Sequence, residues 1–106
     1  MRHELLKRSV FLDDYREIIL FLAEANVLAA DRYCDSVEAA LELLSVHPEM
    51  GPKAGFPRAP EVRFWPLRRY PNYLIFYRVS GNSVVLLRLL YGPRDLAPLI
   101  PVEAGE

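Results

Sequence analysis

Residues 62–95, VRFWPLRRYPNYLIFYRVSGNSVVLLRLLYGPRD, decide the fold of this chain. Three β-rich segments lie in this stretch, at 62–65, 73–79 and 84–91, and side chains alternate between two faces along each of them. Alternation with a period of two is typical of strands. The Gly-Asn pair at 81–82 separates the second and third segments and is a hairpin signal. The stretch therefore predicts a three-stranded antiparallel meander.

The third segment is apolar on both of its faces, which predicts a central strand that is covered on both sides. Helices elsewhere in the chain would cover one face. A chain of 106 residues has little sequence left to cover the other face. We therefore expect exposed apolar surface there, and a protein partner that covers it.

The sequence before the meander predicts a short strand followed by a helical hairpin. The expected strand is residues 3–7, at an edge of the sheet, and Ser9 then has the chemistry of a helix N-cap. Asp13 and Asp14 fall in the next turn, where the helix dipole favours acids. The apolar stripe of this first helix is Phe11, Tyr15, Ile18, Ile19 and Leu22.

A second helix is predicted from about Val27 to Val46, and Pro48 ends it. Only Asn26 separates the two helices, so they are expected to pack antiparallel. The stripe of the second helix is Ala30, Tyr33, Val37, Ala40, Leu41 and Leu44, and its other face is acidic, with Asp31, Asp35, Glu38 and Glu42. The prediction is one α+β domain over residues 1–106, with a Pro/Gly linker at 48–60 and a loose tail at 97–106.

The composition is that of an ordinary soluble domain, with 52% apolar and 25% charged residues. The longest apolar runs are too short to span a bilayer, and the N-terminus has no signal-peptide pattern. Cys34 is the single cysteine, which is consistent with a reducing cytoplasm. We therefore expect a cytoplasmic protein without a membrane partner.

Charge divides the chain into an acidic and a basic part. Residues 1–50 carry five Lys/Arg and ten Asp/Glu, whereas residues 51–97 carry eight and two. This division favours a polar partner on the second part, and the alternative is that the arginines decorate the solvated face of a sheet. The stretch 62–95 holds six arginines: Arg63, Arg68, Arg69, Arg78, Arg88 and Arg94. Arg88 is the least suited to a surface role, because a central strand can instead bury and pair it.

No metal or cofactor pattern accompanies these arginines. His3 and His47 are far apart in sequence, and each is expected to lie on the surface rather than to bind metal. Gly51 and Gly55 lie among prolines and form no phosphate loop. Arginines can hold phosphate in a metal-independent ribonuclease, or they can bind an acidic protein surface or a nucleic-acid backbone. The residues by themselves leave an enzyme and a binding module open.

The order of strand, helical hairpin, Pro/Gly linker and meander resembles the RelE/ParE superfamily of type II toxin–antitoxin toxins, and the ParE-like branch in particular. The segments that carry the resemblance are AADRYCDSVEAALELLSVHPEMG at 29–51, VRFWPLRRYPNYLIFYRV at 62–79 and VVLLRLLYGPRD at 84–95. Together they cover about half of the chain. The resemblance implies the fold of these toxins and a cognate antitoxin as a partner.

The branches of this superfamily differ in mechanism. RelE-like toxins are ribosome-dependent mRNA endoribonucleases that use basic residues and a C-terminal tyrosine or histidine, whereas ParE-like toxins are associated with inhibition of DNA gyrase. Here the position of such a tyrosine, near Ile100, is aliphatic, and no Tyr or His follows Gly92. A general acid or base is half of the nuclease reaction. We therefore expect a gyrase inhibitor rather than an enzyme. The alternatives are a nuclease that uses Arg63 and Arg94 on mRNA at the ribosome, or an antitoxin-binding remnant without toxicity.

The resemblance also implies two surfaces and a role in plasmid stabilisation, without a cofactor or metal. The target-binding candidates are Arg63, Arg68, Arg69, Arg78 and Arg94. The antitoxin-binding candidates, on the helical hairpin and the sheet, are Tyr15, Ile19, Leu22, Tyr33, Val85, Leu87, Leu89 and Tyr91.

Overall fold

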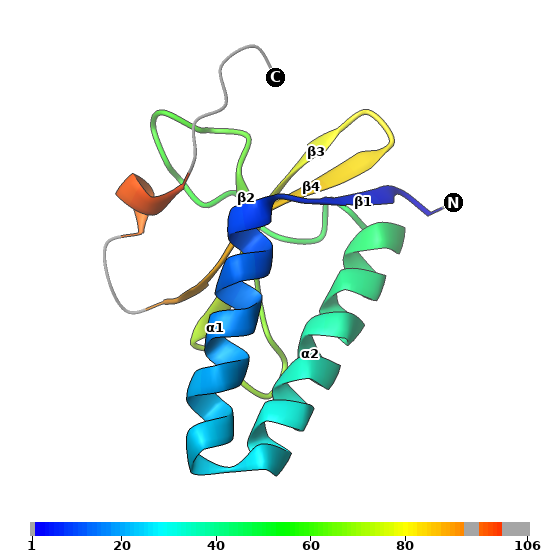
Figure 1. Ribbon diagram of the computed structural model, residues 1–106. Helices are drawn as coiled ribbons and strands as arrows, with labels where there is room; N and C mark the ends of the chain where they lie inside the picture. The colour runs from blue at the N-terminus through cyan, green and yellow to red at the C-terminus, as the bar shows by residue number, and fades with distance from the viewer. Residues whose placement is uncertain (1, 93–95, 101–106) are drawn as a thin grey trace.

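The computed structural model describes residues 2–92 and 96–100 and shows a helical hairpin packed on a mixed sheet (Figure 1). The elements in chain order are β1 (Glu4–Lys7), α1 (Ser9–Ala25), α2 (Val27–Val46), β2 (Arg63–Pro66), β3 (Tyr73–Ser80), β4 (Ser83–Tyr91) and the 3-10 turn η1 (Ala97–Leu99). The predicted α+β class is therefore confirmed. The predicted meander corresponds to β2, β3 and β4.

The sheet has four strands in the order β1-β4-β3-β2. β2, β3 and β4 pair antiparallel, and Gly81 at φ 57° makes the turn between β3 and β4. β1 lies at the edge and pairs parallel with the first half of β4, over Ser83–Leu86. β4 is thus a central strand, as its two apolar faces indicate.

The register of β3 against β4 shifts once. Phe76 pairs with Arg88 and Tyr77 pairs with Leu86, so that Leu87 is the extra residue of a β-bulge. A bulge bends its strand and redirects the side chains that follow it. Leu86 and Leu89 consequently both belong to the core beneath the helices, although three positions separate them.

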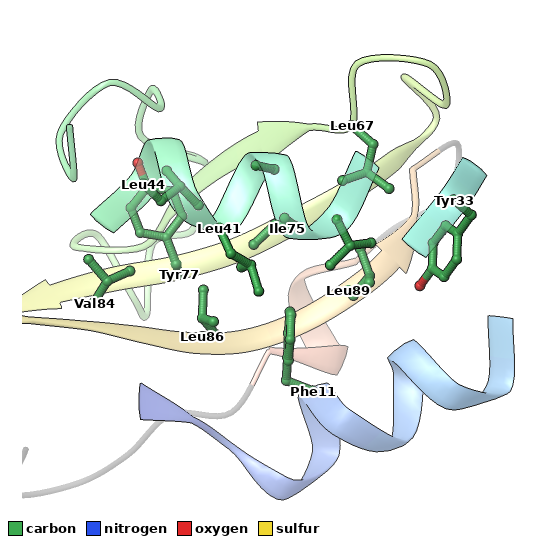
Figure 2. Close-up of a cluster of buried hydrophobic side chains, with 12 residues drawn as sticks. Phe11, Tyr33, Leu41, Leu44, Leu67, Ile75, Tyr77, Val84, Leu86 and Leu89 are labelled. Carbon is green, nitrogen blue, oxygen red and sulfur yellow. The ribbon is translucent and has the colours of Figure 1, made fainter. Parts of the chain in front are cut away.

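The main core lies between the helical hairpin and the sheet. Figure 2 shows Phe11 from α1, Leu41 and Leu44 from α2, and Ile75 and Leu86 from the strands meeting in one cluster. These side chains are at most 2% exposed. The apolar stripe of α2 is buried as predicted. That of α1 is only partly buried, since Tyr15, Ile18, Ile19 and Leu22 pack at the margin of the cluster.

The prediction that the second face of the sheet lacks a cover is wrong. The linker and the C-terminal turn pack there against β3 and β4, with side chains at Ala59, Val62, Phe76, Val85, Leu87, Leu90, Leu96 and Ile100. A Pro/Gly-rich segment has no periodicity, so its role as a cover is not visible in the sequence. The expectation of a loose tail is also wrong for residues 97–100, because Ile100 is 5% exposed. Residues 101–106 lie outside the described residues.

The structure corrects the predicted N-cap of the first helix and shows a cap on α2. Asn26 caps α2, because its side-chain oxygen accepts hydrogen bonds from the backbone N–H groups of Leu28 and Ala29. Ser9, however, is already helical, and the cap residue of α1 is Arg8, whose side chain makes no cap hydrogen bond. The first turn of α1 therefore has no acid, and Asp14 serves a different contact. In the described ranges, no helix combines the length and the apolar character that crossing a membrane would require.

Candidate functional site

Asp14 and Arg88 form a charged pair that joins α1 to β4. The Arg88 Nε donates to Asp14 Oδ2 at 2.7 Å, and Nη2 donates to Oδ1 at 2.8 Å. The backbone N–H of Leu89 also donates to Asp14 Oδ2, at 3.0 Å. The side chains of Arg88 and Asp14 are 18% and 10% exposed. The hydrogen bond to Asp14 raises the pKa of the Arg88 guanidinium above its ordinary value, and partial burial opposes this rise.

Arg88 also reaches the C-terminal turn, because its Nη1 donates to the backbone oxygen of Leu99 at 2.9 Å. One guanidinium therefore ties together α1, β4 and η1. Arg88 is therefore buried and paired, as its position in a central strand suggests. It is not one of the cations that are available to a partner at the surface.

A cavity of about 600 Å³, which we call the α1–β4 groove, lies beside this pair. It is lined by Asp14, Glu17, Ile18, Phe21, Tyr73, Arg88, Leu89, Leu90 and Tyr91. β3 pairs with the second half of β4 along one edge, but β1 pairs only with Ser83–Leu86 along the other, so that edge of β4 borders the groove instead of a strand of the described residues. Phe21 and Tyr91 are 67% and 48% exposed. Large apolar side chains at such exposure are typical of a surface that binds protein.

The electrostatics of the α1–β4 groove also favour a protein ligand. Asp14 and Arg88 neutralise each other within the groove, which leaves Glu17 as its remaining charged lining residue. A carboxylate repels the phosphates of a nucleic acid. The groove is therefore suited to an apolar peptide segment.

The structure divides the predicted antitoxin-binding residues into three groups. Tyr91 and Leu89 line the α1–β4 groove. Tyr15, Ile19 and Leu22 are half-buried on α1 at the margin of the core. The third group is at most 2% exposed and offers almost no surface: Tyr33, Val85 and Leu87. Leu89 is buried to the same extent, although it borders the groove.

Two exposed apolar residues of α1, Leu20 and Phe21, were absent from the predicted set. They are 70% and 67% exposed. The signal for them was present in the sequence, because both lie outside the apolar stripe of the first helix. An apolar side chain on a predicted solvent face is the unusual observation, and its natural explanation is a partner.

The predicted target-binding arginines also separate. Arg68 and Arg69 are exposed in the loop between β2 and β3, and Arg63 is half-buried in β2. Arg78 is only 7% exposed and presents little surface. Arg94 lies outside the described residues. The structure adds Arg32 of α2, which lines one cavity with Arg68 and Arg69. Arg32 is more than 30 positions from Arg68 and Arg69 in the sequence, so no sequence pattern connects the three residues.

Arg63 fixes the backbone of the linker. Its Nη1 donates to the backbone oxygens of Gly51, at 2.7 Å, and Glu49, at 3.2 Å. The backbone N–H of Gly51 in turn donates to the Tyr77 hydroxyl at 3.0 Å. Burial raises the pKa of Tyr77, and the Gly51 N–H and the charge of Arg63 oppose this rise. Tyr77 is therefore a neutral phenol near pH 7 and is not a general base at that pH.

The described residues hold no cluster of three or more His, Cys, Asp or Glu side chains that could bind a metal ion. His3 and His47 do line one cavity, together with residues such as Glu49 and Met50. Sequence spacing did not indicate this proximity, because it arises from the contact between the N-terminus and the end of α2.

Comparison with known proteins gives a consistent result. Curated proteins include no match to this chain. A solved structure, "Chromosomal ParDE TA system from P. aeruginosa", is similar, with a TM-score of 0.70 at 17% sequence identity. The match covers 86% of this chain and 97% of that chain. At this identity, the likeness shows the shared fold.

A family model extends this likeness from the fold to the sequence. The model, described as "ParE toxin of type II toxin-antitoxin system, parDE", matches residues 8–96. The matched range begins just before α1 and reaches the residue that precedes η1, so it includes both helices and β2, β3 and β4. The resemblance to the ParE-like branch is thereby confirmed, and the chain belongs to the ParE toxin family of type II toxin–antitoxin systems.

Proposed function

We propose that this toxin inhibits DNA gyrase through protein contacts and that its cognate antitoxin neutralises it. The observation that carries the proposal is the α1–β4 groove, an apolar site with a single unpaired carboxylate and exposed aromatic side chains. Such a site is suited to a protein segment. The choice of gyrase follows from membership in the ParE toxin family, and a place in the cytoplasm and a role in plasmid stabilisation belong to the same proposal.

The chemistry around Arg63 argues for contacts rather than RNA cleavage. A ribonuclease of this kind needs a cation that is free to hold phosphate and a nearby general acid or base. Arg63 already donates to two linker carbonyls, and Tyr77 is 0% exposed, so its hydroxyl has no access to an RNA. Neither group is therefore poised for cleavage of RNA.

The proposed activity is tested by assaying the purified protein in parallel for gyrase supercoiling and for ribosome-dependent mRNA cleavage. We expect growth arrest on expression, blocked supercoiling and intact mRNA. Cleavage of mRNA that Arg63→Ala or Arg94→Ala abolishes would establish the nuclease instead. A folded chain without toxicity would show an antitoxin-binding remnant and contradict the proposal.

The antitoxin is expected to place an apolar segment in the α1–β4 groove. Phe21→Glu should weaken the toxin–antitoxin complex about tenfold or more, because truncation or charging of a central aromatic contact removes much of the binding energy. Val27→Glu is the matched control, since Val27 is 66% exposed but is not part of the groove lining. Isothermal titration calorimetry with the cognate antitoxin measures both. Equal affinities of the two variants would place the antitoxin elsewhere.

A further inference from the structure

One exposed face of α2 carries a stripe that the core does not explain. Leu28, Arg32, Asp35, Ala39, Leu43 and Val46 follow at helical spacings of three and four residues, so they share one face of the helix. All six are exposed, and Leu28 and Leu43 are 60% and 46% exposed. The buried stripe of α2 lies on the opposite side, at positions such as Val37 and Leu41. This face of the helix therefore has apolar residues at both ends and charged residues at its centre, and the acidic residues Asp31, Glu38 and Glu42 border it.

The centre of the stripe borders a cavity of about 290 Å³. Arg32, Asp35, Ser36 and Ala39 line it from α2, and Arg68 and Arg69 line it from the loop between β2 and β3. Figure 1 shows that this loop lies beside the N-terminal half of α2. Three guanidinium groups and one carboxylate thus face one concave site, which leaves it net positive.

These three guanidinium groups differ from the other arginines described above. Arg88 is bound to Asp14, and Arg63 is bound to the linker carbonyls. Within the described ranges, Arg32, Arg68 and Arg69 make no hydrogen bond or ion pair. Their donors are available to a ligand, and a guanidinium binds a carboxylate through two parallel hydrogen bonds.

The flanks of the cavity decide between a protein ligand and a nucleic acid. A phosphate backbone would need further cations along its path, but exposed Leu28 and Leu43 lie on either side of Arg32 and Ala39 on the helix. Apolar contacts on both sides of a charged centre are typical of a groove that takes an amphipathic segment. The small side chain of Ala39 leaves room for close approach.

We propose that a surface formed by Arg32, Arg68 and Arg69 and flanked by Leu28 and Leu43 binds an amphipathic segment of the toxin's target protein. We call this surface the α2 docking face. That segment would place carboxylates against Arg32, Arg68 and Arg69, and apolar side chains against Leu28 and Leu43. The inference rests on the proposed function, in that the toxin acts through protein contacts. The α2 docking face shares no lining residue with the α1–β4 groove. The two helices lie side by side (Figure 1), so an antitoxin on α1 would hinder a large target on α2.

The first test compares two triple variants that lower the net charge equally. The first variant carries Arg32→Ala, Arg68→Ala and Arg69→Ala and removes the three guanidinium groups of the docking face. The second variant carries Lys7→Ala, Arg16→Ala and Arg58→Ala and removes three exposed cations elsewhere. We expect the first variant to need about tenfold or more protein to block gyrase supercoiling, and the second to match the unaltered protein. Equal potency of the two variants would overturn the proposal. Thermal unfolding checks that both remain folded.

A second variant tests the site without changing its charge. Ala39→Trp fills the centre of the docking face, and Glu24→Trp is its control on the exposed side of α1. Ala39→Trp should inhibit gyrase about tenfold more weakly than Glu24→Trp. Full potency of Ala39→Trp would overturn the proposal, since a bulky indole cannot share the site with a docked segment.

Direct binding separates failure of this proposal from failure of the gyrase assignment. The probes are a labelled helical peptide with Leu flanking a central Glu pair, the same peptide with Gln in place of Glu, and single-stranded DNA. We expect the Glu peptide to bind more tightly than the Gln peptide, and the first triple variant to lose that difference. This result without gyrase inhibition would support the docking face and reject gyrase as the target. Equal binding of the two peptides, or arginine-dependent binding of DNA alone, would overturn the docking face.

Discussion

Replacement of Arg88 by alanine is expected to lower the free energy of unfolding by about 3–5 kcal/mol, because it leaves a buried carboxylate without its cation. Asp14 is 10% exposed, and the two hydrogen bonds from Arg88 at 2.7 and 2.8 Å would both be lost. The backbone N–H of Leu89 would remain as a donor to Asp14. Urea unfolding of the purified toxin measures this change.

The control for Arg88 is Arg16→Ala. Arg16 is 71% exposed on its side chain and lies 3.9 Å from Asp13, so its loss should change stability by no more than about 0.5 kcal/mol. The double variant Asp14→Leu, Arg88→Met should be more stable than Arg88→Ala, because it removes both buried charges. A double variant that is no more stable than Arg88→Ala would contradict the role assigned to the buried charge.

Replacement of Gly51 by alanine is expected to cost about 2–4 kcal/mol, from overpacking together with the loss of hydrogen bonds. A Cβ at this position would lie 2.4 Å from the backbone oxygen of Phe64 and 2.6 Å from the Tyr77 hydroxyl. Phe64 belongs to β2 and is paired with Phe76, so its backbone cannot move freely. The linker must shift instead, away from its contacts with Tyr77 and Arg63.

Gly55→Ala in the same linker provides the comparison. Gly55 has φ 81°, a left-handed conformation, but no atom lies within 4 Å of the position of its Cβ. Only backbone strain is expected there, of about 1–2 kcal/mol. If Gly51→Ala unfolds at the same urea concentration as the unaltered protein, the close approach at Gly51 has no energetic role. If Gly51→Ala unfolds at a lower urea concentration than Gly55→Ala, the contact among Gly51, Tyr77 and Arg63 holds the linker on the sheet.

The sequence by itself determined the elements and the family. Alternating side chains predicted β2, β3 and β4, and helical spacing predicted both helices close to their observed bounds. Asn26 and Gly81 marked the two reversals of the chain, and both act there through local chemistry. These features are readable because periodicity, caps and turns depend on residues that are close in sequence.

Tertiary structure alone decided which charged residues can act on a partner. Arg88 meets an aspartate 74 positions away, Arg63 is bound to the linker, and Arg32 joins Arg68 and Arg69 across two elements. The linker covers the sheet face that the sequence left open to a partner. None of these contacts has a period or a local motif. They depend on how separate elements pack against one another, and packing is the information that a pattern within a single element does not contain.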